Sequence, residues 1–271
     1  MNRFPASRLI GFFAGYLALF PVLGGAQQVE DYRAVSLALS TQHGAAVVAV
    51  KFVMSLAASG KEERIEDTTQ ALLVSKDGLL LVPDRAVSLD LGTLMPAGPA
   101  PGATAPVAKS SEFRVRLAGS DVWLPADLVT RDSQLGIAWL RVRNPPVTGL
   151  SFVNLDDGLR AEPGMVFFTL MRTSDDWGGV TLFHPGLVLG QTQTPRQLLL
   201  VDGMPGVAFA ADGHPLGYVD VDFARLVRNR NGNSGLGLDM ADATMQMTPI
   251  EKIAAATRLA AKLPIVKPAM H

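Results

Sequence analysis

The feature that most restricts the fold is a long series of short apolar segments separated by glycine and proline, which runs over residues 45–221. Segments such as residues 45–56 are rich in β-branched and apolar side chains, which is typical of strands. Asp77-Gly78 and Asp212-Gly213 are strong signals for hairpin turns. Many short strands followed by one helix favour β-barrels over a β-sandwich, so we predict an all-β fold.

The N-terminus has the pattern of an export signal. Arg3 and Arg8 are followed by an apolar run over residues 9–22 and by small residues that end at Ala26. The run is shorter than the roughly 20 residues that a membrane-spanning helix needs. We therefore predict a signal peptide over residues 1–26 and a periplasmic or secreted protein. An uncleaved N-terminal anchor is the alternative.

The rest of the chain divides into consecutive parts. Residues 27–44 form an N-terminal segment with a short helix, residues 45–143 a first barrel and residues 147–242 a second, with the stiff connector Asn144-Pro145-Pro146 between them. Residues 92–109 are rich in Ala, Pro and Gly and bury little apolar surface, so we predict a disordered loop inside the first barrel.

A single helix is expected at the end, over residues 247–263. Thr248, Pro249 and Glu251 have the order of an N-cap, a first helical residue and a third helical residue. Apolar residues then recur on one side of the segment, which predicts a helix that packs against the barrels.

The composition excludes several classes. The formal net charge of −1 gives no reason to expect nucleic-acid binding. The chain has no cysteine, so an exported fold must depend on its core, which 48% apolar residues allow. We expect no cofactor and, after removal of the signal peptide, no membrane segment. The oligomeric state stays open.

The histidines do not have the spacing of a metal motif. We expect them at surface turns and predict no metal site, although histidines distant in the sequence could still converge on a metal. They are His43, His184, His214 and His271.

Residues 201–218 carry a family resemblance. Gly203 and Gly206 provide a glycine frame, Asp212-Gly213 a hairpin turn and Leu216-Gly217-Tyr218 a returning strand. This stretch resembles the nucleophile strand of trypsin-like serine proteases, in particular the HtrA (DegP-like) branch, whose pattern begins G-N-S-G-G-P-L. The position of the nucleophilic serine falls on Pro205.

Other motifs extend the resemblance over about residues 45–261. Residues 75–87 are similar to S-x-D-G-x-I-L-T-N-x-H-V-V, which places Arg85 at the catalytic histidine. Residues 131–141 are similar to D-x-x-x-D-L-A-V-L-K, which places Gly136 at the triad aspartate. The resemblance implies the trypsin-like fold of two six-stranded antiparallel β-barrels with a C-terminal helix. Unlike most HtrA proteins, this sequence shows no PDZ domain after that helix.

The substitutions at these positions remove the chemistry that the family uses. Proline has neither a hydroxyl to attack with nor an N–H for the oxyanion hole, of which Gly203 would supply the other donor. The guanidinium of Arg85 stays protonated and cannot act as a base. We therefore predict a catalytically inactive homologue, a pseudoprotease, with Arg85, Gly136 and Pro205 as degenerate triad positions.

One motif supports the alternative of an active serine endopeptidase or hydrolase. Gly232-Asn233-Ser234-Gly235 spells G-N-S-G, which makes Ser234 a candidate nucleophile. The context of a turn before the terminal helix favours a structural role instead. A scaffold protein that binds no ligand is a third possibility.

The residual role that we predict is recognition of an extended peptide or protein segment along the second barrel. Leu198, Leu200, Gly203 and Gly206 are the expected contacts, because a sheet edge can pair with a peptide even when the triad is lost. Arg85 could favour an acidic ligand, or it could pair with its neighbour Asp84.

Overall fold

The structure, a computed structural model, describes residues 24–58, 61–91, 107–173, 177–194, 197–221 and 245–264. Most of the predicted signal peptide, most of the predicted loop 92–109, and Ser234 lie outside these residues. Within these residues, no helix combines the length and the apolar character that crossing a membrane requires.

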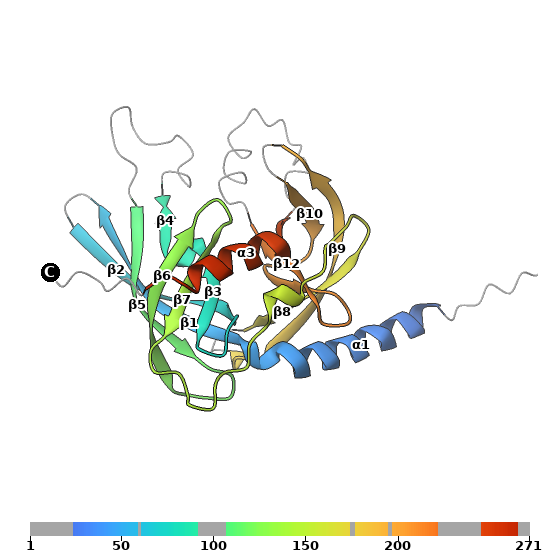
Figure 1. The fold of residues 1–271 in the computed structure, drawn as a ribbon, viewed down its shortest axis with the longest axis horizontal. Coiled ribbons are helices and arrows are strands. Elements are labelled where there is room, and N and C mark those ends of the chain that lie inside the picture. Colours follow the sequence, from blue (N-terminus) through green and yellow to red (C-terminus); the bar gives the residue numbers. More distant parts are fainter. Residues whose placement is uncertain are drawn as a thin grey trace, which may run out of the picture. The chain divides into compact units, whose positions relative to one another are not determined.

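The first barrel is built from six antiparallel strands in the order β1-β2-β3-β7-β6-β5, and pairing of β1 with β5 closes it (Figure 1). A short seventh strand, β4, pairs with the start of β5. Apolar side chains are buried on both faces of its strands: Leu80 and Trp139 are fully buried and point to opposite faces. The strands are β1 (Val47–Ala58), β2 (Lys61–Leu73), β3 (Leu79–Pro83), β4 (Ser88–Asp90), β5 (Val107–Arg116), β6 (Trp123–Asp132) and β7 (Ile137–Val142).

The second barrel is closed in the order β10-β13-β12-β11-β8-β9 and is antiparallel throughout. Phe167 lies at its centre, and a Cβ atom on Gly186 or Gly203 would approach this ring to 2.4 and 2.6 Å, so both positions require glycine. The strands are β8 (Val166–Arg172), β9 (Thr181–Thr192), β10 (Leu198–Asp202), β11 (Gly206–Phe209), β12 (Pro215–Asp220) and β13 (Met245–Pro249). The prediction of an all-β chain with two six-stranded barrels is thereby confirmed.

The C-terminal helix α3 (Ile250–Ala260) also confirms the prediction, but its start differs. Thr248 is not the N-cap, because it pairs with Tyr218 in the β12–β13 ladder and the helix begins after Pro249. The helix buries Ile253 and Thr257. The Nε1–H of Trp139 donates to the hydroxyl of Thr257 over 3.0 Å, which ties α3 to β7.

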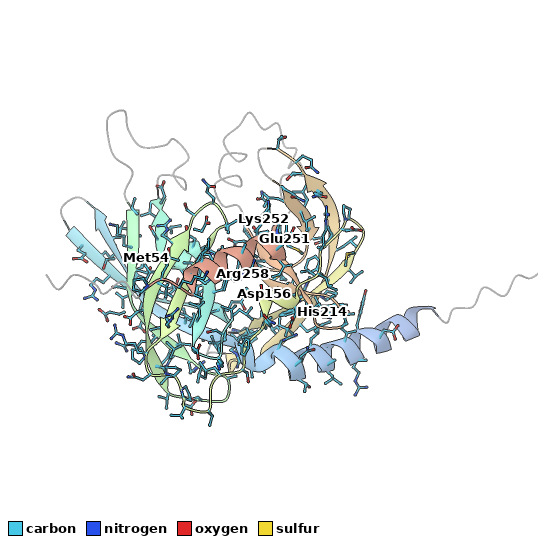
Figure 2. All side chains as sticks on the ribbon, viewed as in Figure 1. Met54, Asp156, His214, Glu251, Lys252 and Arg258 are labelled. Atoms are coloured by element: carbon cyan, nitrogen blue, oxygen red, sulfur yellow. The ribbon has the colours of Figure 1, made fainter. Side chains whose placement is uncertain are left out.

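Polar contacts hold α3 on both sides. The Arg258 guanidinium pairs with Asp156, which lies in the short 3-10 turn Leu155–Asp157, and Figure 2 shows the two side chains together. The Nζ of Lys252 donates to the carbonyl of Gln197 over 3.0 Å, just before β10. The helix is therefore attached to the first barrel through β7 and to the second through this segment.

Two segments differ from the sequence expectation. The N-terminal helix α1 (Gly24–His43) is longer than the short helix expected within residues 27–44, and the predicted cleavage position after Ala26 lies in its first turn. Val107–Lys109, which we placed in the loop 92–109, belong to β5 and pair with β4. Pairing with a distant strand orders these residues, and composition alone does not reveal such a partner.

His43 is also not the surface residue that we expected. It is only 7% exposed, and its ring stacks on Phe209 with the ring centroids 4.5 Å apart. Its Nε2 lies 2.8 Å from the carbonyl oxygen of Gly213, in the β11–β12 turn. Burial lowers the pKa of His43 from its usual 6.5, although the hydrogen bond to Gly213 opposes the shift.

The lowered pKa of His43 predicts that stability falls as the solution becomes acidic. Below about pH 6.5 the unfolded chain takes up a proton on His43 more readily than the folded chain does, so the free energy of unfolding declines with pH until the folded pKa is passed. Above this range both states hold a neutral ring and the effect vanishes. Urea unfolding between pH 8 and 5 measures the slope.

The matched variant is His43→Gln, which keeps a donor for Gly213 but cannot titrate. We expect a smaller decline in the free energy of unfolding for this variant between pH 7 and pH 5. An identical slope in wild type and variant would contradict the role of His43.

Candidate functional site

Two of the three degenerate triad positions lie together beside the second barrel. Arg85 lies in the short 3-10 turn Asp84–Ala86 that follows β3, and Gly136 lies in the turn before β7. The backbone N–H of Asp84 donates to the carbonyl of Gly136 over 2.9 Å, which holds the two turns side by side. A Cβ atom on Gly136 would lie 3.6 Å from Oδ2 of Asp220, at the end of β12.

The Arg85 guanidinium forms an ion pair with Asp220. Arg85 belongs to the first barrel and Asp220 to the second, so the pair joins the two. The side chains are 34% and 26% exposed, so water reaches the pair only in part. Because Asp220 balances the charge of Arg85, the geometry gives no support to the predicted acidic ligand.

Asp84 is not the partner of Arg85, contrary to the alternative that we considered from the sequence. Its carboxylate pairs with Arg131 on β6, with Nε 2.8 Å from Oδ1 and Nη2 2.8 Å from Oδ2. Burial raises the pKa of Asp84, and the charge of Arg131 opposes the shift. Neighbours in sequence have separated because the 3-10 turn sends Arg85 toward β12 and Asp84 toward β6.

The third degenerate position, Pro205, connects β10 with β11. Its carbonyl accepts a hydrogen bond from Nε2 of Gln70 on β2 over 3.2 Å. Gly206 follows with φ at +136°, a conformation that favours glycine. The loop is therefore held by a side chain of the first barrel, and Pro205 contributes no N–H to it.

Gln70 and Arg172 form a second polar connection between the barrels. Oε1 of Gln70 accepts from the backbone N–H of Arg172 on β8 over 3.2 Å. The guanidinium of Arg172 donates to three carbonyls: that of Val47 at 2.9 Å, that of Gly179 at 2.9 Å and that of Gly44 at 3.2 Å. Burial lowers the pKa of Arg172, and the charge of Arg116 adds to the shift.

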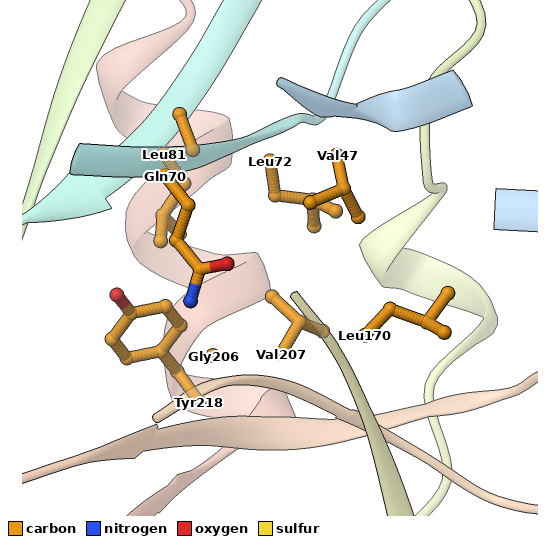
Figure 3. Close-up of a pocket in the computed structure, with 9 residues that line it drawn as sticks. Val47, Gln70, Leu72, Leu81, Leu170, Gly206, Val207 and Tyr218 are labelled. Carbon is orange, nitrogen blue, oxygen red and sulfur yellow. The ribbon is translucent and has the colours of Figure 1, made fainter. Parts of the chain in front are cut away.

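The space beside Gly206 is almost filled. A cavity of about 20 Å³ remains there, which has room for roughly one water molecule. Figure 3 shows the Gln70 amide directed toward Gly206 and Tyr218, with Leu72, Leu170 and Val207 across the cavity. Burial raises the pKa of Tyr218 and the charge of Asp220 adds to it, so this phenol stays protonated. No peptide side chain fits into this cavity.

The predicted peptide-binding strand has no free edge. Leu198 and Leu200 lie on β10, which pairs with β9 on one side and with β13 on the other. Leu198 is buried and Leu200 is half-buried. Gly203 packs on Phe167. A peptide cannot add to β10 while both ladders are formed, so the arrangement contradicts the reason for which these residues were proposed.

The described histidines do not activate a hydroxyl. His43 and His214 contact backbone carbonyls, of Gly213 and of Asp157, and the buried Nδ1 of His184 has no partner. In the parts of the chain that the structure covers, no group of three or more His, Cys, Asp or Glu side chains could hold a metal. Ser234 and His271 lie outside the described residues.

The sequence did not reveal the partners of the degenerate positions. Asp220, Gln70 and Arg172 belong to none of the motifs. Asp220 is 135 residues from Arg85 in sequence, and Gln70 is 135 residues from Pro205. Arg172 is 125 residues from Val47. The resemblance indicated where the triad would be but not what replaced it. The Arg at a histidine position suggested only an acidic ligand or a pairing with the neighbouring Asp84, and neither hypothesis named Asp220.

The fold is similar to a solved structure. The crystal structure of the MamO protease domain from Magnetospirillum magneticum, in its apo form, superimposes with a TM-score of 0.50 at 15% sequence identity, over 80% of this chain and 98% of that domain. No protein-family model matches the sequence, and no curated protein matches it. The structural likeness shows the fold alone: the chain has the trypsin-like fold of two six-stranded antiparallel barrels.

The ion pair between the barrels predicts a measurable coupling. We expect Arg85→Ala and Asp220→Ala each to lower the melting temperature, since each leaves the other charge half-buried. A double-mutant cycle should give a coupling of about 1–2 kcal/mol, between the values typical of exposed and of buried pairs. The coupling should shrink in high salt.

The pair Arg64–Glu112 is the matched control, because its side chains are 55% and 48% exposed and both lie in the first barrel. Its coupling should be smaller, at about 0–1 kcal/mol. An equal or smaller coupling for Arg85–Asp220 would contradict the role that we assign to this pair.

Proposed function

We propose that this protein is an exported, catalytically inactive relative of trypsin-like proteases that acts by binding a protein or as a scaffold. The observation that carries the proposal is the Arg85–Asp220 ion pair. A permanently charged guanidinium stands at the position of the general base, and its charge is engaged in joining the barrels.

The loss of the nucleophile, of the base or of an oxyanion donor is by itself enough to slow a serine protease strongly. Removal of the nucleophile or the base of a serine-protease triad costs about 10⁶ in turnover. Loss of one oxyanion donor costs about 10²–10³ more. Here Pro205 supplies neither a hydroxyl nor an N–H, and Gly136 supplies no carboxylate. A binding or scaffold role remains open to such a chain, because the barrels and their interface are intact.

The first test is covalent labelling. The purified protein should not react with a fluorophosphonate probe and should not hydrolyse casein or fluorogenic peptides above buffer background, since no activated hydroxyl is present at Pro205. An active trypsin sample at equal concentration serves as the positive control. Labelling that approaches one probe per chain would overturn the proposal.

A labelled protein would then be compared with the Ser234→Ala variant. Loss of labelling in this variant would assign the activity to Ser234, as the alternative of a non-standard hydrolase requires. Persistence of labelling would place the nucleophile elsewhere in the chain.

Restoration of the triad should fail. The combined changes Arg85→His, Gly136→Asp and Pro205→Ser should give little or no turnover. Gly136 has φ at +72°, so an aspartate there is strained, and its Cβ would lie 3.6 Å from a carboxylate oxygen of Asp220. Peptidase assays on the folded triple variant measure the result, and robust turnover would show that the scaffold kept its preorganised site.

A further inference from the structure

The strands β5 and β6 separate on one side of the first barrel. They pair over only three positions, from Arg116↔Trp123 to Arg114↔Pro125. Beyond Pro125, β6 continues to Asp132 with β7 as its partner, while β5 pairs with β1 and β4. The described residues provide no strand that pairs with the β5 side of β6 over residues 126–132.

Two local features explain why the ladder stops there. Pro125 has no N–H and cannot continue the ladder in a regular way. On the opposite strand Glu112 has φ at +54°, a strained conformation for a residue other than glycine, and the β1–β5 register shifts at the same level. The bulge bends β5 away from β6, so the gap follows from the backbone itself.

The gap is a groove of about 560 Å³, a volume within the usual range for ligand sites. Phe113, Ala126 and Leu128 provide apolar lining. Two acidic and two basic side chains balance each other along it: Asp127 pairs with Arg143, and Glu112 lies 3.9 Å from Arg114. This balance does not favour a polyanion or a strongly charged ligand.

Ser110 on β5 is one of the residues that line the groove. Its backbone N–H donates to the carbonyl of Val87 at 2.9 Å, and its hydroxyl is inaccessible to solvent, so the groove does not expose this hydroxyl to a ligand.

We propose that the groove between β5 and β6 binds a short extended peptide segment of a partner protein. An unpaired strand edge selects a peptide backbone, because only a backbone offers alternating donors and acceptors at strand spacing. The apolar lining and the balanced charge select a segment with alternating apolar and uncharged polar side chains. The segment lies against β6 from Ala126 to Leu128.

This inference goes beyond the proposed function, because it does not depend on the state of the triad positions.

The test begins with selection from a phage-displayed library of random eight-residue peptides against the full chain. We expect enrichment of peptides with alternating apolar residues, whose dissociation constants are then measured by fluorescence anisotropy with synthetic copies. A copy N-methylated at alternate amides keeps the side chains but loses the backbone donors, and it should bind at least tenfold more weakly. Absence of enrichment, or equal binding by the methylated copy, would overturn the proposal.

Variants locate the site. Ser110→Leu fills the groove and should abolish binding, whereas Ser151→Leu, at an exposed serine outside the groove, should leave the affinity unchanged. Ser110→Ala removes only this unexposed hydroxyl, so it should leave the affinity unchanged, while the free protein melts at the same or a higher temperature. Equal affinities for all three variants would overturn the proposal.

A measurement on the wild type avoids any dependence on how the variants fold. Amide hydrogen exchange over residues 126–130 should slow on addition of an enriched peptide, because new backbone hydrogen bonds form along β6. Peptides that protect the segment around Gly206 instead, and that bind Ser110→Leu as well as the wild type, would place recognition at the inter-barrel junction and overturn the groove assignment. Fluorophosphonate labelling reports separately on the proposed function, so the two can fail independently.

Discussion

The half-buried guanidinium of Arg172 is the contact on which the junction of the two barrels depends. It donates to carbonyls at Gly44, at Val47 in β1 and at Gly179 before β9, and its own backbone N–H reaches Gln70. These partners come from both barrels. The carbonyl partners satisfy the charged group, although its partial burial lowers its pKa.

The same junction gives a physical reason for the inactivity that we propose in a fold that stays intact. In an active protease the space between the barrels holds a base that must gain and lose a proton, and a nucleophile that must be free to attack. Here that space holds Arg85 paired with Asp220, and Gln70 bonded to the carbonyl of Pro205. Under the proposed function, fixed contacts occupy the positions at which a protease has mobile and reactive groups, so the site contributes to stability instead of chemistry.

A closed barrel has few places at which to bind an extended peptide, because closure pairs nearly every strand edge. The strand β10 shows this: the chain positions Leu198 and Leu200 between two partners. The first barrel differs because the bulge at Glu112 and the proline at Pro125 end one ladder early. The groove that results leaves backbone groups of β6 available to a partner.

Much of the architecture was predictable from local patterns. Turn dipeptides such as Asp77-Gly78, alternating apolar segments and the helical period of residues 250–260 depend on near neighbours, and the order of the motifs implied two barrels. The predicted ends of the elements were less accurate: Thr248 has the chemistry of an N-cap, but it lies in β13 and pairs with Tyr218 in β12. His43 had the sequence context of a turn residue, yet it packs against Phe209, which lies 166 residues later.

The sequence by itself determined what this protein lacks, because a proline at position 205 has no hydroxyl and no N–H in any fold. It also determined the strand-rich class, since turn chemistry and apolar alternation are local properties. Only the tertiary structure decided that Arg85 meets Asp220 and not the adjacent Asp84, that β10 has no free edge, and that β5 leaves β6 at Pro125. Each of these depends on strands that are distant in sequence and are brought together by closure of the barrels, and no local pattern encodes that distance.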